Sequence, residues 1–391
     1  MDTINKVNFK FIDLFSGIGA FHLAMDSFGG DCVLASEIDD FAVETYTENF
    51  KMNSKVNIRN LEVKDIPNHE VLCAGFPCQA FSVAGYGLGF QDKTRGTLFF
   101  EIARILDGKI KEGHPVKFII LENVKQLVAH DNGKTYNTII SVLKDLGYIL
   151  PKNPLIVSPV CLGIPQDRER VFIPGIYKDF TDKEYLEFDV PKKQITSIDS
   201  VLDNDFDEKF KISEYEEKIF SAWDEFHQKL APHFGVIWVD EFGQTYDYSG
   251  DADWRQKYCR ENRKLYLDNK DFIDGWMTKY DVRNFKLRDR RFEWQAGPDY
   301  KSIWETVIQL RQSGIRCKRP TNFQTLVAMV QTPVIGKLKR RLTPREAARL
   351  QSFPDSYILN KRDDKAYKQL GNSANVEVIK FIAKQLFDQE K

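Results

Sequence analysis

The sequence predicts an α/β protein, built as a doubly wound parallel sheet with a second, smaller domain. Over the first 175 residues, short apolar runs alternate with amphipathic stretches, as expected of parallel strands joined by crossover helices. After residue 176 this rhythm is lost, and the chain becomes charged and aromatic. Its 391 residues also exceed the roughly 250 to 300 at which a single hydrophobic core stops growing. We therefore expect two domains.

Six apolar runs predict the strands, and they cover residues 9–14, 31–36, 71–74, 118–121, 155–159 and 171–176. Apolar residues at helical spacing predict four helices between them, at residues 21–28, 40–49, 97–107 and 137–146. Near the C-terminus, a helix start is predicted by Thr343 as N-cap, Pro344 at the first helical position and Glu346 closing a capping box. An amphipathic pattern over residues 376–387 predicts the last helix.

Charge and cysteine usage narrow the class of protein. The net charge is −1, so the overall balance does not indicate a nucleic-acid partner, but residues 283–319 hold ten basic against four acidic side chains. The six cysteines include no CxxC pair, which argues against a disulfide framework and against structural zinc. His69 and Cys73 come nearest to a ligand pair, and they lie beside a predicted strand. We expect no metal.

Hydropathy predicts no membrane segment. Apolar runs stay short of the roughly 18 residues that span a bilayer, and the first six residues lack the apolar centre of a signal peptide. We expect a cytoplasmic protein that has no membrane partner.

A glycine-containing loop, Phe15-Ser16-Gly17-Ile18-Gly19, follows the first predicted strand and precedes a helix. Glycines at such a turn let the backbone approach a ligand closely. His22 replaces the third glycine of a dinucleotide fingerprint, which argues against a nicotinamide oxidoreductase. Glu37, at the end of the second strand, stands where an acidic residue binds ribose hydroxyls. The alternative is a tight turn plus a surface acid.

A cysteine follows the third predicted strand, in the segment Gly75-Phe76-Pro77-Cys78-Gln79. Ligands bind at the carboxyl ends of strands in an α/β sheet, which favours a functional position. A free cysteine is more often a small core residue. Pro77 before Cys78 and the loop 81–93 after it favour exposure instead.

Two charged clusters adjoin other predicted strands. Glu122 follows the fourth strand, where a carboxylate could equally cap a helix. The segment Gln166-Asp167-Arg168-Glu169-Arg170 precedes the sixth strand, and its alternating charges could equally form a solvated edge.

Together these four clusters resemble the DNA (cytosine-5)-methyltransferase family of the bacterial restriction-modification type. The resemblance extends to residues 341–350, which look like the family's ninth motif, and to residues 369–373, which look like its tenth. It implies a Rossmann-like, S-adenosylmethionine-dependent methyltransferase fold. The implied catalytic domain spans residues 1–185 and is completed by 366–391. Residues 186–365, the ninth-motif segment included, would form the target-recognition domain.

The resemblance implies S-adenosylmethionine as methyl donor, S-adenosylhomocysteine as product, and no metal. In the family, Asp often bonds the adenine amine where this sequence offers Asn60, whose carbonyl oxygen can still accept. The implied cofactor contacts are Phe15, Gly17, Ile18, Gly19, Glu37, Ile38, Asn60, Pro77, Asn372 and Ser373.

The implied chemistry begins with addition of the Cys78 thiolate to C6 of cytosine, because C5 by itself is a poor nucleophile. Glu122 would share a proton with N3, and Arg168 and Arg170 would hold the base's O2 and the glutamate. A base stacked in a duplex cannot reach Cys78, so it must be flipped out. The glycine-dotted loop 85–89 suits a segment that closes over it.

The implied partner is double-stranded DNA, bound by a monomer, with a cognate restriction endonuclease acting separately. The residues assigned to DNA binding are Gln79, Ser82, Arg311, Arg316 and Thr325. Two alternatives stay open. One is the tRNA-acting branch of the family, marked by a Cys-Phe-Thr element that this sequence lacks. The other is a catalytically inactive DNA-binding homologue.

Overall fold

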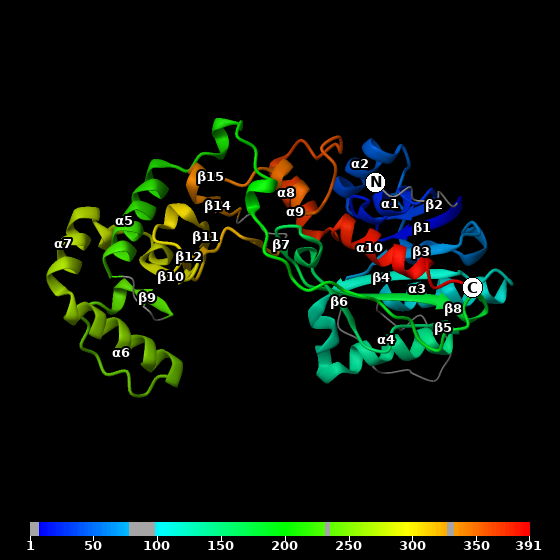
Figure 1. Cartoon of the computed structure of the whole chain (residues 1–391), viewed down its shortest axis with the longest axis horizontal. Coiled ribbons are helices and arrows are strands. Elements are labelled where there is room, and N and C mark those ends of the chain that lie inside the picture. Colours follow the sequence, from blue (N-terminus) through cyan, green and yellow to red (C-terminus); the bar gives the residue numbers. More distant parts are fainter. Residues whose placement is uncertain (1–7, 78–97, 231–234, 327–331) are drawn as a thin grey trace. The chain divides into compact units, whose positions relative to one another are not determined.

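The computed structural model describes residues 8–77, 98–230, 235–326 and 332–391. The chain divides into two compact units (Figure 1). The first comprises residues 1–196, 324–329 and 347–391, and the second comprises 197–323 and 330–346. The α/β sheet and the second, smaller domain predicted from the sequence are confirmed.

The first unit contains a seven-stranded sheet in the order β2-β1-β3-β4-β8-β5, with β6 also pairing with β8. Four strands are parallel, and they are β1 (Phe9–Leu14), β2 (Gly30–Ser36), β3 (Val71–Gly75) and β4 (Phe118–Val124). Each contains one of the first four predicted runs. The other strands are β5 (Tyr148–Ile149), β6 (Leu155–Val157) and β8 (Arg170–Tyr177).

The sixth predicted run was expected to form a parallel strand, but it forms β8, which runs antiparallel to β4. It also pairs antiparallel with β5 and β6. A parallel neighbour needs a long crossover connection, usually through a helix. The segment between β6 and β8 contains only the 3-10 turn η5 (Pro159–Leu162) and the two-residue strand β7 (Gln166–Asp167). The chain therefore returns along the neighbouring strand in the opposite direction.

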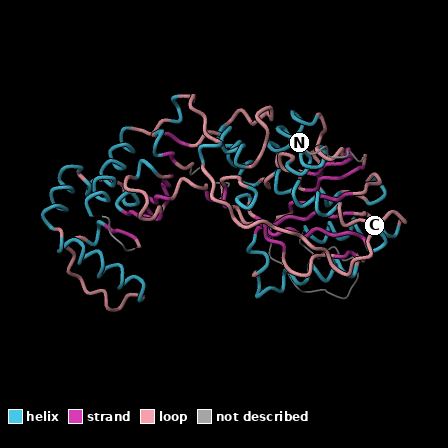
Figure 2. The backbone as a smooth tube through the Cα atoms, viewed as in Figure 1, coloured by secondary structure: helices cyan, strands magenta, loops and turns pink. Residues whose placement is uncertain are grey.

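Helices cover both faces of this sheet (Figures 1 and 2). On one face, α3 (Leu98–Lys111) and α4 (Lys134–Asp145) share a buried core with apolar side chains of β1, β3 and β4. On the other, α1 (Ala20–Asp26) lies against α10 (Val376–Phe387), where the Phe28 and Phe387 rings are 5.5 Å apart. Two more helices, α2 (Asp40–Phe50) and α9 (Asp363–Asn372), belong to this unit.

The predicted helix start near the C-terminus is confirmed by α8 (Pro344–Leu350). The Thr343 N–H donates to Glu346 Oε2 at 2.8 Å, and the Glu346 N–H donates to Thr343 Oγ1 at 3.2 Å. These two hydrogen bonds form the expected capping box.

The second unit is built on a six-stranded sheet in the order β15-β14-β11-β12-β10-β9. A cluster of buried aromatic side chains fills its core, with the Trp223 and Phe292 rings stacked at 4.9 Å. Its helices are α5 (Glu214–Leu230), α6 (Asp253–Asp268) and α7 (Lys270–Tyr280). The strands are β9 (Val236–Trp238), β10 (Arg291–Gln295), β11 (Val307–Arg311), β12 (Gly314–Lys318), β14 (Val334–Ile335) and β15 (Arg340–Arg341). The short strand β13 spans Phe323–Gln324.

The division between the units differs from the expected bounds of 185/186 and 365/366. Residues 347–365 group with the first unit because their side chains are held there. Tyr357 donates its hydroxyl to the Ile18 carbonyl, and Gln351 Nε2 donates to the Leu370 carbonyl at 2.8 Å. Most of the ninth-motif segment's helix therefore supports the first unit, although Thr343 and Glu346 belong to the second.

Candidate active site

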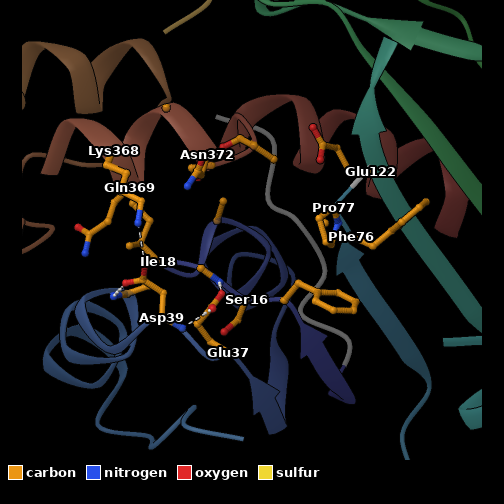
Figure 3. Close-up of a pocket in the computed structure, with 18 of the residues that line it drawn as sticks. Ser16, Ile18, Glu37, Asp39, Phe76, Pro77, Glu122, Lys368, Gln369 and Asn372 are labelled. Carbon is orange, nitrogen blue, oxygen red and sulfur yellow. Dashed lines mark hydrogen bonds and ion pairs between the residues drawn. The ribbon is translucent and has the colours of Figure 1, made fainter. Parts of the chain in front are cut away.

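A cavity of about 600 Å³ opens at the carboxyl ends of β1, β2, β3 and β4 in the first unit. Loops from these strands form one wall, and the end of α9 forms another. Figure 3 shows Glu122 beside Phe76 and Pro77, and Glu37 and Asp39 further along the cavity. The strand ends of an α/β sheet are the usual place for a ligand.

The loop after β1 turns sharply because three of its residues have positive φ. These are Phe15 at 56°, Gly17 at 54° and Gly19 at 83°. The Gly17 N–H donates to Glu37 Oε2 at 2.9 Å, so the acidic residue at the end of β2 holds the turn in place. Phe15, Gly17 and Ile18 line the cavity, as the sequence predicted.

Gly19 has a packing role, and it is not among the described residues that line the cavity. A Cβ there would lie 2.2 Å from Cε2 of Phe50. Phe50 in turn stacks on His22, with ring centroids 3.9 Å apart. The residue that replaces the third glycine of a dinucleotide fingerprint is thus part of the packing beneath the loop.

Glu37 is already hydrogen-bonded by backbone groups. Its Oε1 accepts from the N–H groups of Ile38 at 2.6 Å and Asp39 at 2.8 Å. In the part of the chain that the structure describes, Oε2 accepts only from the Gly17 N–H, so it keeps one further lone pair for a ligand hydroxyl. Ile38 is 64% exposed and lines the cavity, so its apolar side chain offers a surface for a flat ring.

Glu122 and Arg170 form a buried ion pair on adjacent antiparallel strands. Arg170 Nε lies 3.1 Å from Glu122 Oε1. Glu122 is 9% exposed. Burial raises its pKa, while the charges of Arg170 and Arg168 act in the opposite direction. A carboxyl group with a raised pKa is suited to hold or share a proton.

Pro77 and Phe76 carry the chain along this end of the cavity. Asn123 Nδ2 donates to the Phe76 carbonyl at 2.8 Å, which ties the segment after β3 to the end of β4. Cys78, Gln79, Ser82 and the loop 85–89 lie outside the described residues. Because Pro77 lines the cavity, the backbone reaches the Glu122 end immediately before Cys78.

The side chain of Arg168 donates to backbone carbonyls, and its predicted role at the base and the glutamate stays a prediction. It is 2% exposed. Its Nη1 donates to Leu326 at 3.0 Å, and its Nη2 donates to Gly371 at 2.9 Å and Ser373 at 2.7 Å. Burial lowers its pKa to about 9. Arg168 therefore holds two distant segments at the cavity, whereas Arg170 alone makes the ion pair with Glu122.

The C-terminal residues Asn372 and Ser373 do line the cavity. Helix α9 brings them there, since Gln369 Nε2 donates to the Phe41 carbonyl at 2.7 Å and Lys368 Nζ lies 3.0 Å from Asp39 Oδ2. Several lining residues were not assigned from the sequence, among them Phe21, Asp39, Phe41, Phe76, Lys368 and Gln369. No sequence pattern marks Lys368 or Phe41.

Two other assigned residues differ in whether they reach the cavity. Asn60 ends the 3-10 helix η1 (Ile58–Asn60), is exposed, and is not among the described cavity-lining residues. Its contact with an adenine stays a prediction. Thr325, assigned to DNA, lines the cavity, and its hydroxyl donates to the Asp167 carbonyl at 3.0 Å.

Arg311 and Arg316 lie in the second unit, on β11 and β12. Both contact Glu293 of β10. Elsewhere in the described residues, no helix is long and apolar enough to cross a membrane. Nor do three or more His, Cys, Asp or Glu side chains group as a metal site in that part of the chain.

The fold and the site together define an α/β enzyme whose ligand cavity contains a buried carboxyl–guanidinium pair. The C-5 cytosine-specific DNA methylase family matches the chain over residues 9–388. The protein therefore belongs to this family and is a DNA cytosine-5 methyltransferase.

Relatives of established name agree with this assignment. The type II methyltransferase M.HpaII of Haemophilus parainfluenzae is 35% identical over 98% of this chain and 90% of its own length. M1.ScrFI of Lactococcus lactis subsp. cremoris is 33% identical over 97% and 78%. M.HhaI of Haemophilus parahaemolyticus is 31% identical over 96% and 93%.

Solved structures support the fold. A mutant DNMT2 of Spodoptera frugiperda matches with a TM-score of 0.54 and 22% identity, over 97% of this chain and 99% of its own. The Dnmt2 methyltransferase of S. pombe matches with a TM-score of 0.54 and 18% identity, over 98% and 99%. At this identity the likeness concerns the fold alone.

Proposed function

We propose that this enzyme flips a cytosine out of a specific duplex sequence and methylates C5 through a covalent bond between Cys78 and C6. The single observation that carries the proposal is the buried Glu122–Arg170 pair in a cavity that is also lined by Pro77, the residue directly before Cys78. A thiolate, a proton-sharing carboxyl group and a fixed guanidinium are the groups that this addition requires.

S-adenosylmethionine fits the other end of the cavity. The tight turn at Gly17 lets a ligand approach the backbone, and Glu37 Oε2 retains a lone pair for a ribose hydroxyl. Ile38 and Phe41 offer apolar surfaces for the adenine, and Asn372 and Ser373 would hold the amino-acid end. When bound, this cofactor supplies a methyl group on a positively charged sulfur.

The residues of the chain then divide the chemistry. The Cys78 thiolate forms a bond to C6, and electron density moves through the ring toward N3. Glu122 supplies or shares a proton there, while Arg170 holds the carboxylate through Nε. The Arg170 Nη1 donates to the Glu169 carbonyl at 2.9 Å, which leaves Nη2 to donate to the base's O2. After C5 gains the methyl group, a base such as water takes the C5 proton, the electron pair of that bond re-forms the C5–C6 double bond, and Cys78 leaves as a thiolate.

The second unit, residues 197–323 and 330–346, is proposed to recognise the DNA sequence. Its basic side chains concentrate between residues 283 and 319, and it lies outside the cofactor cavity. The names of the relatives favour a restriction-modification system with a separate endonuclease. We propose that the enzyme acts as a monomer. The tRNA alternative rests on no described side chain, since the DNMT2 likeness concerns only the fold.

Bisulfite sequencing of plasmid from cells that express the chain tests the activity and reveals the target sequence. A duplex with 5-fluorocytosine at that target then tests the mechanism. Fluorine leaves no proton to remove from C5, so the enzyme should stay attached to DNA through denaturing electrophoresis, and only with S-adenosylmethionine present. Peptide mapping should place the bond at Cys78.

The matched controls use two cysteine variants. Cys78→Ser should not trap, because a hydroxyl near its ordinary pKa is a far weaker nucleophile than a thiolate. Cys161→Ser should trap as the wild type does. Failure to trap on a site that the enzyme methylates, or a bond to another thiol, would refute the mechanism. Methylation of tRNA with none of DNA would favour the tRNA alternative.

A further inference from the structure

Polar side chains line one face of the second unit's sheet, on its central strands. Glu293 of β10 and Gln309 of β11 each pair in register with Arg316 of β12. Direct partners on neighbouring strands project to the same face. The alternate residues Phe292, Ile308 and Ile315 are fully buried in the core on the opposite face. The polar residues therefore form a row on the face turned away from this core.

Two guanidinium groups in this row share one carboxylate oxygen. Glu293 Oε2 lies 2.6 Å from Arg311 Nη2 and 2.8 Å from Arg316 Nε. The Glu293 side chain is 14% exposed, and the arginine side chains are 25% and 24% exposed. Burial lowers the pKa of Arg311, and the neighbouring charge of Arg316 lowers it further. With two positive charges and one negative charge, this half-buried cluster has a net positive charge, and its remaining guanidinium N–H groups need a further hydrogen-bond acceptor.

The two arginines are held by different atoms. Arg316 is bound through Nε, so in the described part of the chain its two terminal nitrogens remain for a ligand. Arg311 is bound through a terminal nitrogen, and its Nε is buried with no hydrogen-bond partner in the described part of the chain. The Gln309 Oε1 is also buried and lacks a partner among those residues. Among the described residues, Arg316 thus keeps both terminal nitrogens for a ligand, whereas one terminal nitrogen of Arg311 is already bound to Glu293.

We propose that Arg316 reads a guanine in the major groove and that Glu293 is the positioning residue that orients it. A guanidinium with both terminal nitrogens available donates to guanine O6 and N7 together. Arg311 occupies the second position on the carboxylate and limits the rotation of Glu293. The inference rests on the proposed DNA-reading role of this unit, and it divides that role between two arginines that look equivalent in the sequence.

The experiment measures methylation of duplexes in which each base pair of the target is replaced in turn. Arg316→Ala should lower discrimination by about 5- to 150-fold at one guanine position, the range that a bidentate contact supplies. Arg316→Lys keeps the charge but loses the paired donors, and it should lose discrimination at the same position. Arg311→Ala should have the smaller effect.

Glu293→Gln tests whether Glu293 orients Arg316 or only supports the fold, through two measured quantities: non-specific DNA binding and discrimination at the guanine. It removes a negative charge from the face, so non-specific DNA binding should strengthen while discrimination at the same guanine weakens. In an Arg316→Ala background the effect on discrimination should vanish, because the positioned side chain is gone. Glu217→Gln is the matched control. Glu217 pairs with Lys339 at 2.6 Å in the same unit, and its loss should leave the discrimination profile unchanged.

The outcomes separate this inference from the function on which it rests. If Arg316→Ala weakens all sequences equally and reduces the salt dependence of binding, Arg316 contacts phosphate and the inference is overturned. The same holds if Glu293→Gln leaves discrimination intact in a variant that unfolds at the wild-type temperature. If the wild-type enzyme methylates no DNA, the proposed function itself fails.

Discussion

Alanine at Gly19 should mainly destabilise the fold, whereas alanine at Gly17 should mainly weaken cofactor binding. Both glycines have positive φ, at 54° and 83°. An alanine in this backbone conformation costs about 1 to 2 kcal/mol. At Gly19 the added Cβ would also lie 2.2 Å and 2.7 Å from two atoms of the Phe50 ring. Overpacking of this kind adds about 1 to 3 kcal/mol, so the total at Gly19 is about 2 to 5 kcal/mol.

At Gly17 the added Cβ meets no atom within 4 Å. It projects from a residue that lines the cavity, so at the proposed cofactor site it would occupy space that S-adenosylmethionine needs. Only the backbone term of about 1 to 2 kcal/mol then applies to folding. The steric conflict appears on binding, where about 1 to 3 kcal/mol corresponds to an affinity loss of about 5- to 150-fold.

Thermal unfolding and calorimetric titration with S-adenosylhomocysteine measure the two effects separately. For a domain of this size class, each kcal/mol lowers Tm by about 2 to 4 °C. Gly17→Ala should therefore lower Tm by about 2 to 8 °C and bind the ligand poorly, and Gly19→Ala should lower Tm by about 4 to 20 °C.

Gly113→Ala supplies the control, because Gly113 has a φ of 79° and no atom within 4 Å of an added Cβ. It should lower Tm as Gly17→Ala does and should leave the affinity unchanged. Equal losses of stability at Gly17 and Gly19, or normal affinity in Gly17→Ala, would refute the assignment of these two roles.

Two further predictions concern the buried charged residues. Glu122→Gln should lower kcat by about 10²- to 10⁴-fold with unchanged affinity for S-adenosylhomocysteine, because the amide keeps the shape and cannot pass a proton. Burial raises the pKa of Glu122, so its contribution to stability is complete below the ordinary carboxyl pKa and is lost as pH rises through the raised value. The Tm of the wild type should therefore fall relative to that of Glu122→Gln as pH rises. Parallel curves of Tm against pH for the two proteins would contradict this. Arg168→Met leaves three carbonyls without their donor, at about 1 to 3 kcal/mol each, so it should lower both Tm and ligand affinity. Arg170→Met should mainly reduce turnover, and a normal affinity in Arg168→Met would count against its holding of Gly371 and Ser373.

Patterns local in the chain were predictable. The four parallel strands and the helices between them follow from the spacing of apolar residues, because a buried face imposes its period on the sequence. The capping box at Thr343 and Glu346 was equally predictable, since its two hydrogen bonds join residues three apart. Glu122 could be placed near the cavity because it lies near the carboxyl end of β4, a strand of the parallel sheet.

The direction of β8 could not be predicted in this way. A run of apolar residues buried on both faces looks the same in either orientation, and its pairing with β4 is decided by the length of the connection before it. The position of residues 347–365 was likewise hidden. They group with the first unit through contacts such as Tyr357 with Ile18, which are far apart in the chain.

The sequence by itself determined the class of reaction, methyl transfer to cytosine C5. It places a cysteine, a glutamate and two arginines at strand ends, and these segments resemble the motifs of a known family. Only the tertiary structure distinguished the two arginines of residues 168–170. Arg168 is enclosed and donates to three backbone carbonyls, whereas Arg170 pairs with Glu122. Likewise, only the sheet of the second unit brings Arg311 and Arg316 onto one oxygen of Glu293. Residue type specifies which hydrogen bonds a side chain can make, but the partners within its reach are decided by packing between distant segments.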